Sequence, residues 1–144
     1  MFRYSLDQPV RWKDVDAAGV LNNAVYLTLV EQSRYGYFQE LDLLEGPFDF
    51  MFLLGETTAR YLAPGRAGML LTVKARTARL GTKSFDQEYE VWHQDTQLAR
   101  ITARLVWCDA DLKSCPIPAA VRARIAAFEG IDEGGAGPGD STRT

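Results

Sequence analysis

A short turn with acidic and amide side chains comes just before the longest helical pattern in the sequence. Asp14, Asp16 and Gly19 lie in this turn, and Asn22 or Asn23 is placed to start the helix. The first N–H groups of a helix have no partner inside it, and the helix dipole favours negative charge there. A carboxylate beside such donors could attack a polarised carbonyl, or accept a proton from an attacking water.

The same residues also have structural explanations. Asp16 could simply accept hydrogen bonds from nearby backbone N–H groups, as turn aspartates do, and the turn alone favours this explanation. Asp14 is expected to hold the turn or a partner strand. Two carboxylates could suggest a metal, but no further ligands cluster here, so no metal site is predicted. His93, the only histidine, is expected to lie in a solvated turn.

The helix that follows is predicted from about Asn22 to Leu41. Asn22 is a good N-cap, and it leaves Leu21 and Tyr26 at the hydrophobic-staple positions. Apolar and small residues recur at three- and four-residue steps and predict one buried face: Tyr26, Leu29, Val30, Ser33, Tyr37 and Leu41. The polar residues Gln32, Arg34, Gln39 and Glu40 are expected mostly elsewhere. Ser33 and Gly36 are small enough to let the helix lie close to a sheet, and Gly46-Pro47 ends it.

Five strand-like runs surround this helix in the sequence. Alternation and turn residues predict strands over residues 5–13, 50–62, 69–80, 84–92 and 98–108, with a hairpin turn at 93–96. A short helix is predicted at about 119–128. One long helix with a meander of strands indicates an α+β layout, an antiparallel sheet wrapped over that helix. We predict a single domain over residues 1–130 and a disordered Gly-rich tail over 131–144.

Composition narrows the classes of protein to consider. The chain has 144 residues, of which 47% are hydrophobic, and a formal net charge of −3, which argues against general nucleic-acid binding. The N-terminus has no signal-peptide pattern, and no apolar run approaches the roughly 20 residues that span a bilayer. We therefore expect a cytoplasmic protein that binds no membrane, with Cys108 and Cys115 as free thiols.

The motif residues resemble a known family. The segment from Asp14 to Val20, followed by Asn22, Asn23 and Tyr26, is similar to the opening motif of the 4-hydroxybenzoyl-CoA thioesterase family of hotdog-fold proteins. Further residues extend the resemblance over about residues 8–125: Glu31, Arg34, Glu56, Tyr61, Pro64-Gly65 and Leu80 to Ser84. Some relatives carry a histidine or an aromatic residue near the positions of Asn22 and Asn23, which leaves the acyl specificity open.

The resemblance implies a fold, an assembly and a site. It implies a hotdog fold, with a five-stranded antiparallel sheet around one long helix and a short C-terminal helix. The minimal unit would be a dimer, often a dimer of dimers, with sites at the subunit interface. Asp16 would be the catalytic carboxylate, and the backbone N–H of Asn23 would bind the thioester carbonyl. Two further groups would contact the substrate: Gly19, Asn22 and Tyr26 near the reacting centre, and Thr82, Lys83 and Ser84 at coenzyme A.

The function expected on this basis is hydrolysis of an acyl-CoA to a free acid and coenzyme A. No metal and no bound cofactor are expected, because coenzyme A is part of the substrate. Asp16 could serve as nucleophile or as general base. Glu31 is expected to pair with a neighbour instead, and Glu56 to be a strand carboxylate with local hydrogen bonds. Three alternatives stay open: hydrolysis of an acyl group from a carrier protein, which would need a basic docking surface; a module that binds acyl thioesters without turnover; and a hotdog dehydratase or hydratase.

Overall fold

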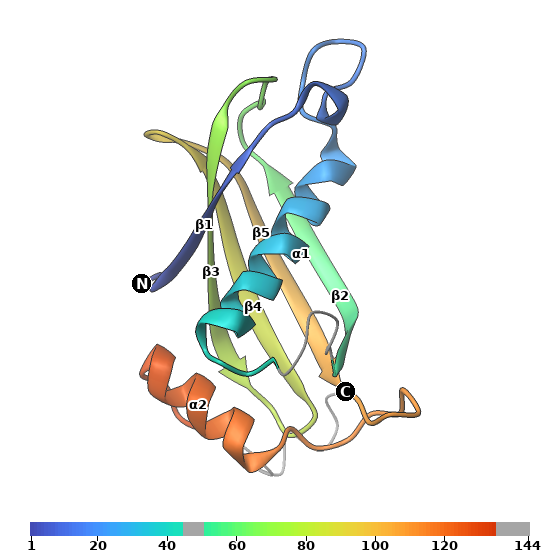
Figure 1. Ribbon diagram of the computed structural model, residues 1–144, viewed down its shortest axis with the longest axis vertical. Coiled ribbons are helices and arrows are strands. Elements are labelled where there is room, and N and C mark those ends of the chain that lie inside the picture. Colours follow the sequence, from blue (N-terminus) through green and yellow to red (C-terminus); the bar gives the residue numbers. More distant parts are fainter. Residues whose placement is uncertain (45–50, 135–144) are drawn as a thin grey trace. The chain divides into compact units, whose positions relative to one another are not determined.

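The computed structural model describes residues 1–44 and 51–134. It contains five strands, two α-helices and one 3-10 turn (Figure 1): β1 Tyr4–Pro9, η1 Trp12–Asp14, α1 Asn23–Glu40, β2 Phe52–Tyr61, β3 Leu70–Leu80, β4 Ser84–His93, β5 Thr96–Trp107 and α2 Ala119–Glu129. The strands form one sheet in the order β1-β3-β4-β5-β2, so β1 and β2 are its edges. The predicted α+β hotdog architecture, with one long helix and a short C-terminal helix, is confirmed.

Most element boundaries lie close to the sequence predictions, but the first strand is shorter. It ends at Pro9 instead of residue 13, because the chain turns into η1, where Asp14 accepts the backbone N–H of Arg11 at 2.8 Å. Trp12 suggested a continuing strand, yet its side chain is 84% exposed on this turn. The predicted helix stop at Gly46-Pro47, the first residue of the predicted second strand and part of the predicted tail, 135–144, lie outside the described residues.

The chain divides into two compact units. The first unit comprises Met1–Tyr37, Ala59–Ala75 and Tyr89–Ile101. In it, β1 pairs antiparallel with β3 in a register from Tyr4 opposite Ala75 to Pro9 opposite Leu70. Helix α1 packs against these strands through buried side chains. Gln8 of β1, for example, donates from Nε2 to the Leu29 carbonyl at 2.8 Å and to Ser33 Oγ at 3.0 Å.

Small residues bring α1 close to β1, as the sequence predicts. Ser33 is fully buried, and a Cβ on Gly36 would overlap the Tyr4 hydroxyl. One residue differs from the prediction for this helix. Arg34 is only 6% exposed and belongs to the buried side of α1, because its guanidinium finds a partner, Tyr89, on β4.

The second unit comprises Phe38–Thr58, Arg76–Glu88 and Thr102–Thr144. Its core is an aromatic cluster of Phe38, Phe52, Phe85 and Trp107, with ring centroids 4.9–6.4 Å apart. Helix α2 is tied to β3, since Glu129 Oε2 accepts the Thr77 N–H at 2.7 Å. Cys108 and Cys115 are both free, as predicted. Neither helix in the described ranges is long and apolar enough to cross a membrane.

Candidate active site

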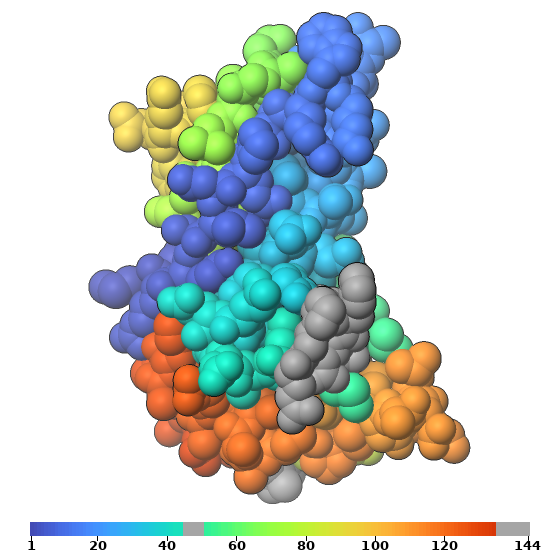
Figure 2. Space-filling model, in the orientation of Figure 1, coloured from blue at the N-terminus to red at the C-terminus, as the bar shows by residue number. Residues whose placement is uncertain are grey.

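The acidic turn before α1 is folded back on itself like a small hairpin. Val15 forms an antiparallel bridge with Leu21, and the Asn22 N–H donates to the Asp14 carbonyl at 2.9 Å. At the tip, the Asp16 N–H donates to the Val20 carbonyl, also at 2.9 Å. This pairing holds Asp16 close in the chain fold to the first residues of the helix. The turn lies on the surface of the molecule, in the blue part of Figure 2.

Gly19 makes the tip of this hairpin possible. Its φ of +78° lies in the left-handed region, which a glycine adopts without steric cost. Its N–H donates to the Asp16 carbonyl at 2.9 Å. A Cβ at this position would meet nothing within 4 Å, so the glycine is required for its backbone conformation and not for space.

Asp14 has a structural role, as the sequence predicts. It is buried, and its carboxylate accepts the Arg11 N–H at 2.8 Å and Arg11 Nε at 3.2 Å. Burial alone would raise the pKa of Asp14. The hydrogen bonds from the Arg11 side chain and backbone, with the charges of Arg11 and Lys13, outweigh that effect, so the pKa lies below its ordinary value.

Asp16 is exposed and uses one oxygen to hold the turn. Oδ1 accepts the N–H groups of Ala18 at 2.9 Å and Val20 at 3.2 Å. The hydrogen bonds to nearby backbone N–H groups that are expected of a turn aspartate are therefore present. Within residues 1–44 and 51–134, no donor reaches the second oxygen, Oδ2. Oδ1 thus fixes the orientation of the carboxylate, and Oδ2 is available to another group.

The start of α1 leaves one backbone donor available. Asn22 caps the helix as predicted, since its Oδ1 accepts the Ala24 N–H at 2.9 Å, and its carbonyl accepts the Val25 N–H at 2.9 Å. The N–H of Asn23, the first helical residue, donates to no acceptor among the described residues. It is the kind of donor that can bind a carbonyl oxygen or a developing oxyanion.

Tyr26 and Tyr61 pack against each other at the start of α1. Tyr26 is 2% exposed, its ring lies 5.1 Å from that of Tyr61 with the planes 64° apart, and burial raises the pKa of its hydroxyl. Tyr61 donates its hydroxyl to the Asn23 carbonyl at 3.1 Å. The role of Tyr61 was missed in the sequence because it lies 38 residues from Asn23.

The connection between β2 and β3 anchors the same turn. The Leu21 N–H donates to the Gly65 carbonyl at 2.8 Å, and Val20 bridges Arg66. A Cβ on Gly65 would approach Leu21 Cβ to 3.0 Å. Five of the candidate residues are thus gathered around one helix start in the first unit: Asp16, Gly19, Asn22, Asn23 and Tyr26.

The residues expected at coenzyme A belong to the second unit: Thr82 and Lys83 lie in the turn between β3 and β4, and Ser84 begins β4. Thr82 and Lys83 are half-buried, and their carbonyls accept the N–H groups of Ile117 at 2.9 Å and Trp107 at 2.7 Å. Ser84 is fully buried, and its Oγ accepts Arg79 Nη2 at 3.2 Å. Backbone hydrogen bonds therefore hold the turn, in which Thr82 and Lys83 are partly exposed, whereas Ser84 is enclosed.

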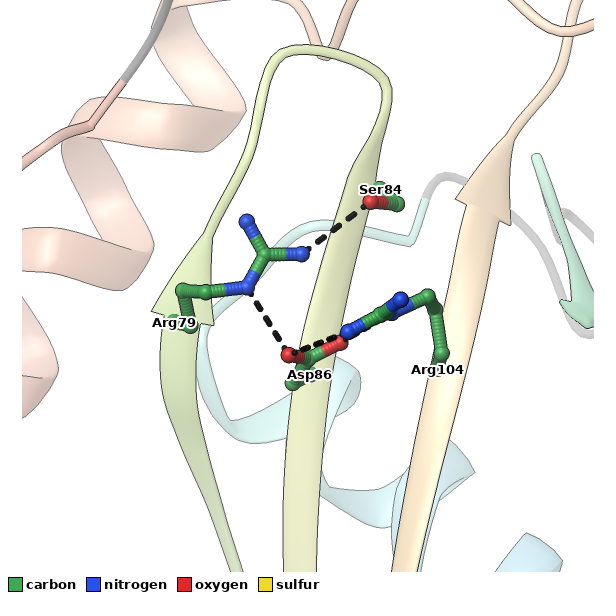
Figure 3. Close-up of polar contacts among 4 residues, drawn as sticks. All are labelled: Arg79, Ser84, Asp86 and Arg104. Atoms are coloured by element: carbon green, nitrogen blue, oxygen red, sulfur yellow. Dashed lines mark hydrogen bonds and ion pairs between the residues drawn. The ribbon is translucent and has the colours of Figure 1, made fainter. Parts of the chain in front are cut away.

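A cluster of charges lies beside this turn (Figure 3). Asp86 accepts Arg79 Nε at 2.8 Å and Arg104 Nε at 2.9 Å, so one carboxylate is bonded to two guanidiniums. Burial would raise the pKa of Asp86, but the hydrogen bonds and charges of both arginines outweigh it, and its pKa is lowered. Arg122 donates to the carbonyls of Gly81 at 2.9 Å and Thr82 at 3.1 Å.

The remaining acids do not behave as expected. Glu31 was predicted to pair with a neighbour and Glu56 to be bonded locally, but neither side chain has an ion pair or hydrogen bond in the described part of the chain. Glu31 lies on the exposed side of α1, and Glu56 acts on Arg104 only from a greater distance. Across the described ranges, no group of three or more His, Cys, Asp or Glu side chains could hold a metal ion.

Comparison with known proteins shows the family. Residues 10–125 match the thioesterase-like superfamily. A thioesterase from Thermus thermophilus, whose crystal structure holds coenzyme A and zinc, is 34% identical, covers 91% of this chain and 98% of its own, and superposes with a TM-score of 0.82. A thioesterase-superfamily protein from Jannaschia sp. CCS1 is 26% identical over 90% of this chain and 85% of its own, with a TM-score of 0.80.

A curated relative comes from a plant. A chloroplastic acyl-acyl carrier protein thioesterase of Arabidopsis thaliana is 23% identical over 130 residues, which is 87% of this chain and 68% of that protein. The resemblance to hotdog-fold thioesterases that the Asp14–Asn23 motif predicts is confirmed. The chain therefore belongs to the thioesterase-like superfamily and is a thioester hydrolase with the hotdog fold.

Proposed function

We propose that this thioester hydrolase acts on an acyl-CoA, with Asp16 as its catalytic carboxylate and the Asn23 N–H as the donor to the thioester carbonyl. One observation carries the proposal: a carboxylate with an available Oδ2 and a helix start with an available N–H are held by the same closed turn. Gly19, Asn22 and Tyr26 complete the substrate side of this site.

The chemistry follows from these two groups. The Asn23 N–H stabilises negative charge as it grows on the carbonyl oxygen, and one such donor is typically worth about 10²–10³ in rate. Asp16 Oδ2 can attack the carbonyl carbon, whereupon the C–S bond breaks, the thiolate leaves and water cleaves the mixed anhydride. Alternatively, Oδ2 accepts a proton from water as that water attacks. Both routes end with a carboxylic acid and a thiol, and neither needs a strong general acid.

The basic cluster of the second unit supports coenzyme A as the carrier of the acyl group. Four cations lie at or near the β3–β4 turn, namely Arg79, Lys83, Arg104 and Arg122, and three acids lie near them, namely Asp86, Glu56 and Asp109. An excess of positive charge at a rigid turn suits a phosphate group. We infer that Thr82 and Lys83 contact the phosphorylated part of the substrate, and that Ser84 positions Arg79.

Strand β2 supports assembly into a dimer or tetramer. It is an edge of the sheet, and eight of its ten residues are exposed, including Leu53 at 47% and Leu54 at 49%. An exposed, partly apolar edge strand readily pairs with a second copy of itself. A second copy there would cover these leucines. The cytoplasmic location and the single domain over residues 1–130 stay predictions from the sequence.

A second candidate substrate is an acyl group on a carrier protein. The similarity to the plant acyl-acyl carrier protein thioesterase favours it, and the basic cluster could equally meet an acidic carrier. The two substrates differ in the adenine nucleotide, which only coenzyme A has. Comparison of kcat/KM for one acyl group on coenzyme A and on a carrier protein would distinguish them. A module that binds without turnover would release no thiol from either.

The decisive experiment measures thiol release from a panel of acyl-CoAs by the wild type and by Asp16→Asn. We expect turnover on at least one acyl-CoA and a loss of at least about two orders of magnitude in the variant. Asp95→Asn is the matched control, because Asp95 is an exposed acid in the β4–β5 turn. Equal activity of Asp16→Asn and the wild type would remove Asp16 from the mechanism.

A further inference from the structure

Helix α1 contains a buried arginine that the proposed mechanism does not use. Arg34 is 6% exposed, and it donates from Nε to the Tyr89 hydroxyl on β4 at 2.8 Å. Its Cζ lies 5.4 Å from the centroid of the Tyr89 ring. Tyr89 thus fixes the guanidinium by a hydrogen bond and by its ring face.

Tyr89 does not neutralise this charge. Complete burial raises the pKa of its hydroxyl to about 12, so the phenol is protonated at neutral pH. No carboxylate oxygen of a described residue lies within 4.0 Å of Arg34. The nearest acid along the helix is Glu31, one turn earlier and exposed. A buried cation without a counter-charge is costly, and natural proteins usually pair it.

The free end of the guanidinium is reachable from outside. Nη1 and Nη2 donate to no described residue, yet neither is sealed from solvent. Leu27 and Glu31, seven and three residues before Arg34, neighbour it on the helix surface, and both of these are exposed. A ligand would therefore reach the guanidinium along the border between the buried and the exposed side of α1. Leu27, whose exposed fraction is 39%, lies on this route.

We propose that Arg34 is a carboxylate-binding site, in which Nη1 and Nη2 form a planar fork that grips both oxygens and Leu27 contacts the apolar body of the ligand. A guanidinium matches a carboxylate in this bidentate way, and its fixed Nε leaves only the outer edge available. The carboxylate has two sources, a small organic acid or an acidic side chain of a second copy of this chain. The site stands apart from Asp16 and does not depend on the proposed function.

The test compares thermal unfolding in benzoate and in benzamide, its neutral counterpart, at constant ionic strength. We expect benzoate at about ten times its Kd to raise the Tm of the wild type by roughly 3 °C, and benzamide to leave it unchanged. The benzoate shift should disappear in Arg34→Met and persist in Glu31→Gln. Arg34→Lys keeps the charge but loses the fork, so its affinity for benzoate should fall at least about fivefold.

Sedimentation of the same variants identifies the source of the carboxylate. If benzoate has no effect on the wild type but Arg34→Met weakens self-association at least about tenfold, with Glu31→Gln unchanged, the acid comes from the second copy. If benzoate has no effect and association is also unchanged, the proposal is wrong. It is equally wrong if Arg34→Met keeps the benzoate shift. Should Arg34→Met not fold, the Arg34→Lys titration and the change of the Arg34 Nε–H resonance of the wild type with benzoate decide between the same outcomes.

Discussion

The carbonyl of Asp14 accepts the backbone N–H of Asn22 at 2.9 Å, and this one bond closes the turn that carries Asp16. The Val15–Leu21 bridge is the next pairing toward the tip of the turn, and the hydrogen bond between the Asp16 N–H and the Val20 carbonyl comes after it. The buried carboxylate of Asp14 is held in turn by Arg11. Asp14 therefore positions the proposed catalytic group through the backbone, whereas its own side chain takes no part in the chemistry.

Gly19→Ala tests the tip of this turn. The φ of +78° is strained for alanine, although its Cβ would meet no atom within 4 Å. We expect the free energy of unfolding to fall by about 1–2 kcal/mol and thiol release to fall with it, because Asp16 loses its fixed orientation. Gly19→Asn should be milder in urea unfolding, since asparagine tolerates this region. If both variants match the wild type, the turn does not need this conformation.

Gly36→Ala tests the close approach of α1 to β1. The new Cβ would overlap the Tyr4 hydroxyl oxygen and lie 3.1 Å from Tyr4 Cζ. We expect a loss of about 1–3 kcal/mol in the free energy of unfolding. In a Tyr4→Phe background, which lacks that oxygen, the same substitution should cost less, by at least about 0.5 kcal/mol. A double-mutant cycle measured by urea unfolding gives this coupling, and strictly additive effects would contradict the contact.

Asp86→Asn tests the charge cluster through its pH dependence. The pKa of Asp86 is lower in the folded state than its ordinary value. The ion pairs therefore stabilise the folded protein fully at a pH above the pKa of Asp86 in the unfolded chain. This stabilisation is lost as the pH falls through the pKa of the folded state. At pH 7 we expect the variant to lose about 1–2 kcal/mol of unfolding free energy, and the difference from the wild type to shrink below about pH 4.

Glu88→Gln is the matched control for this measurement. Glu88 pairs with the single cation Arg76, and both side chains are about one-third exposed, at 37% and 33%. Solvent screening should keep its effect below about 1 kcal/mol. If Glu88→Gln lowers the free energy of unfolding as much as Asp86→Asn does, the pairing of Asp86 with two arginines stabilises the protein no more than a single exposed ion pair.

The parts of the molecule that follow local rules could be predicted from the sequence. The Asn22 cap and the helix start follow from residue type and spacing, and so does the available Asn23 N–H, because every helix start leaves such donors. Strands β3 to β5 follow from alternation. The mistakes have long-range causes. Arg34 was placed outside the buried face because its partner Tyr89 lies 55 residues away, and Tyr61 reaches Asn23 across 38 residues.

Substitutions of Asn22 can separate an effect on the stability of the fold from an effect on thiol release. Asn22→Ala removes the acceptor of the Ala24 N–H and should cost about 1 kcal/mol in urea unfolding. Asn22→Asp keeps the acceptor and adds a negative charge that the helix dipole favours, so its stability should equal or exceed that of the wild type. The same charge would oppose the oxyanion that we place at the Asn23 N–H, so thiol release should fall at least about fivefold. Asn22→Ser, a neutral cap, should keep both properties near the wild type. An Asn22→Asp variant that is both stable and fully active would mean that no negative charge develops at the start of α1.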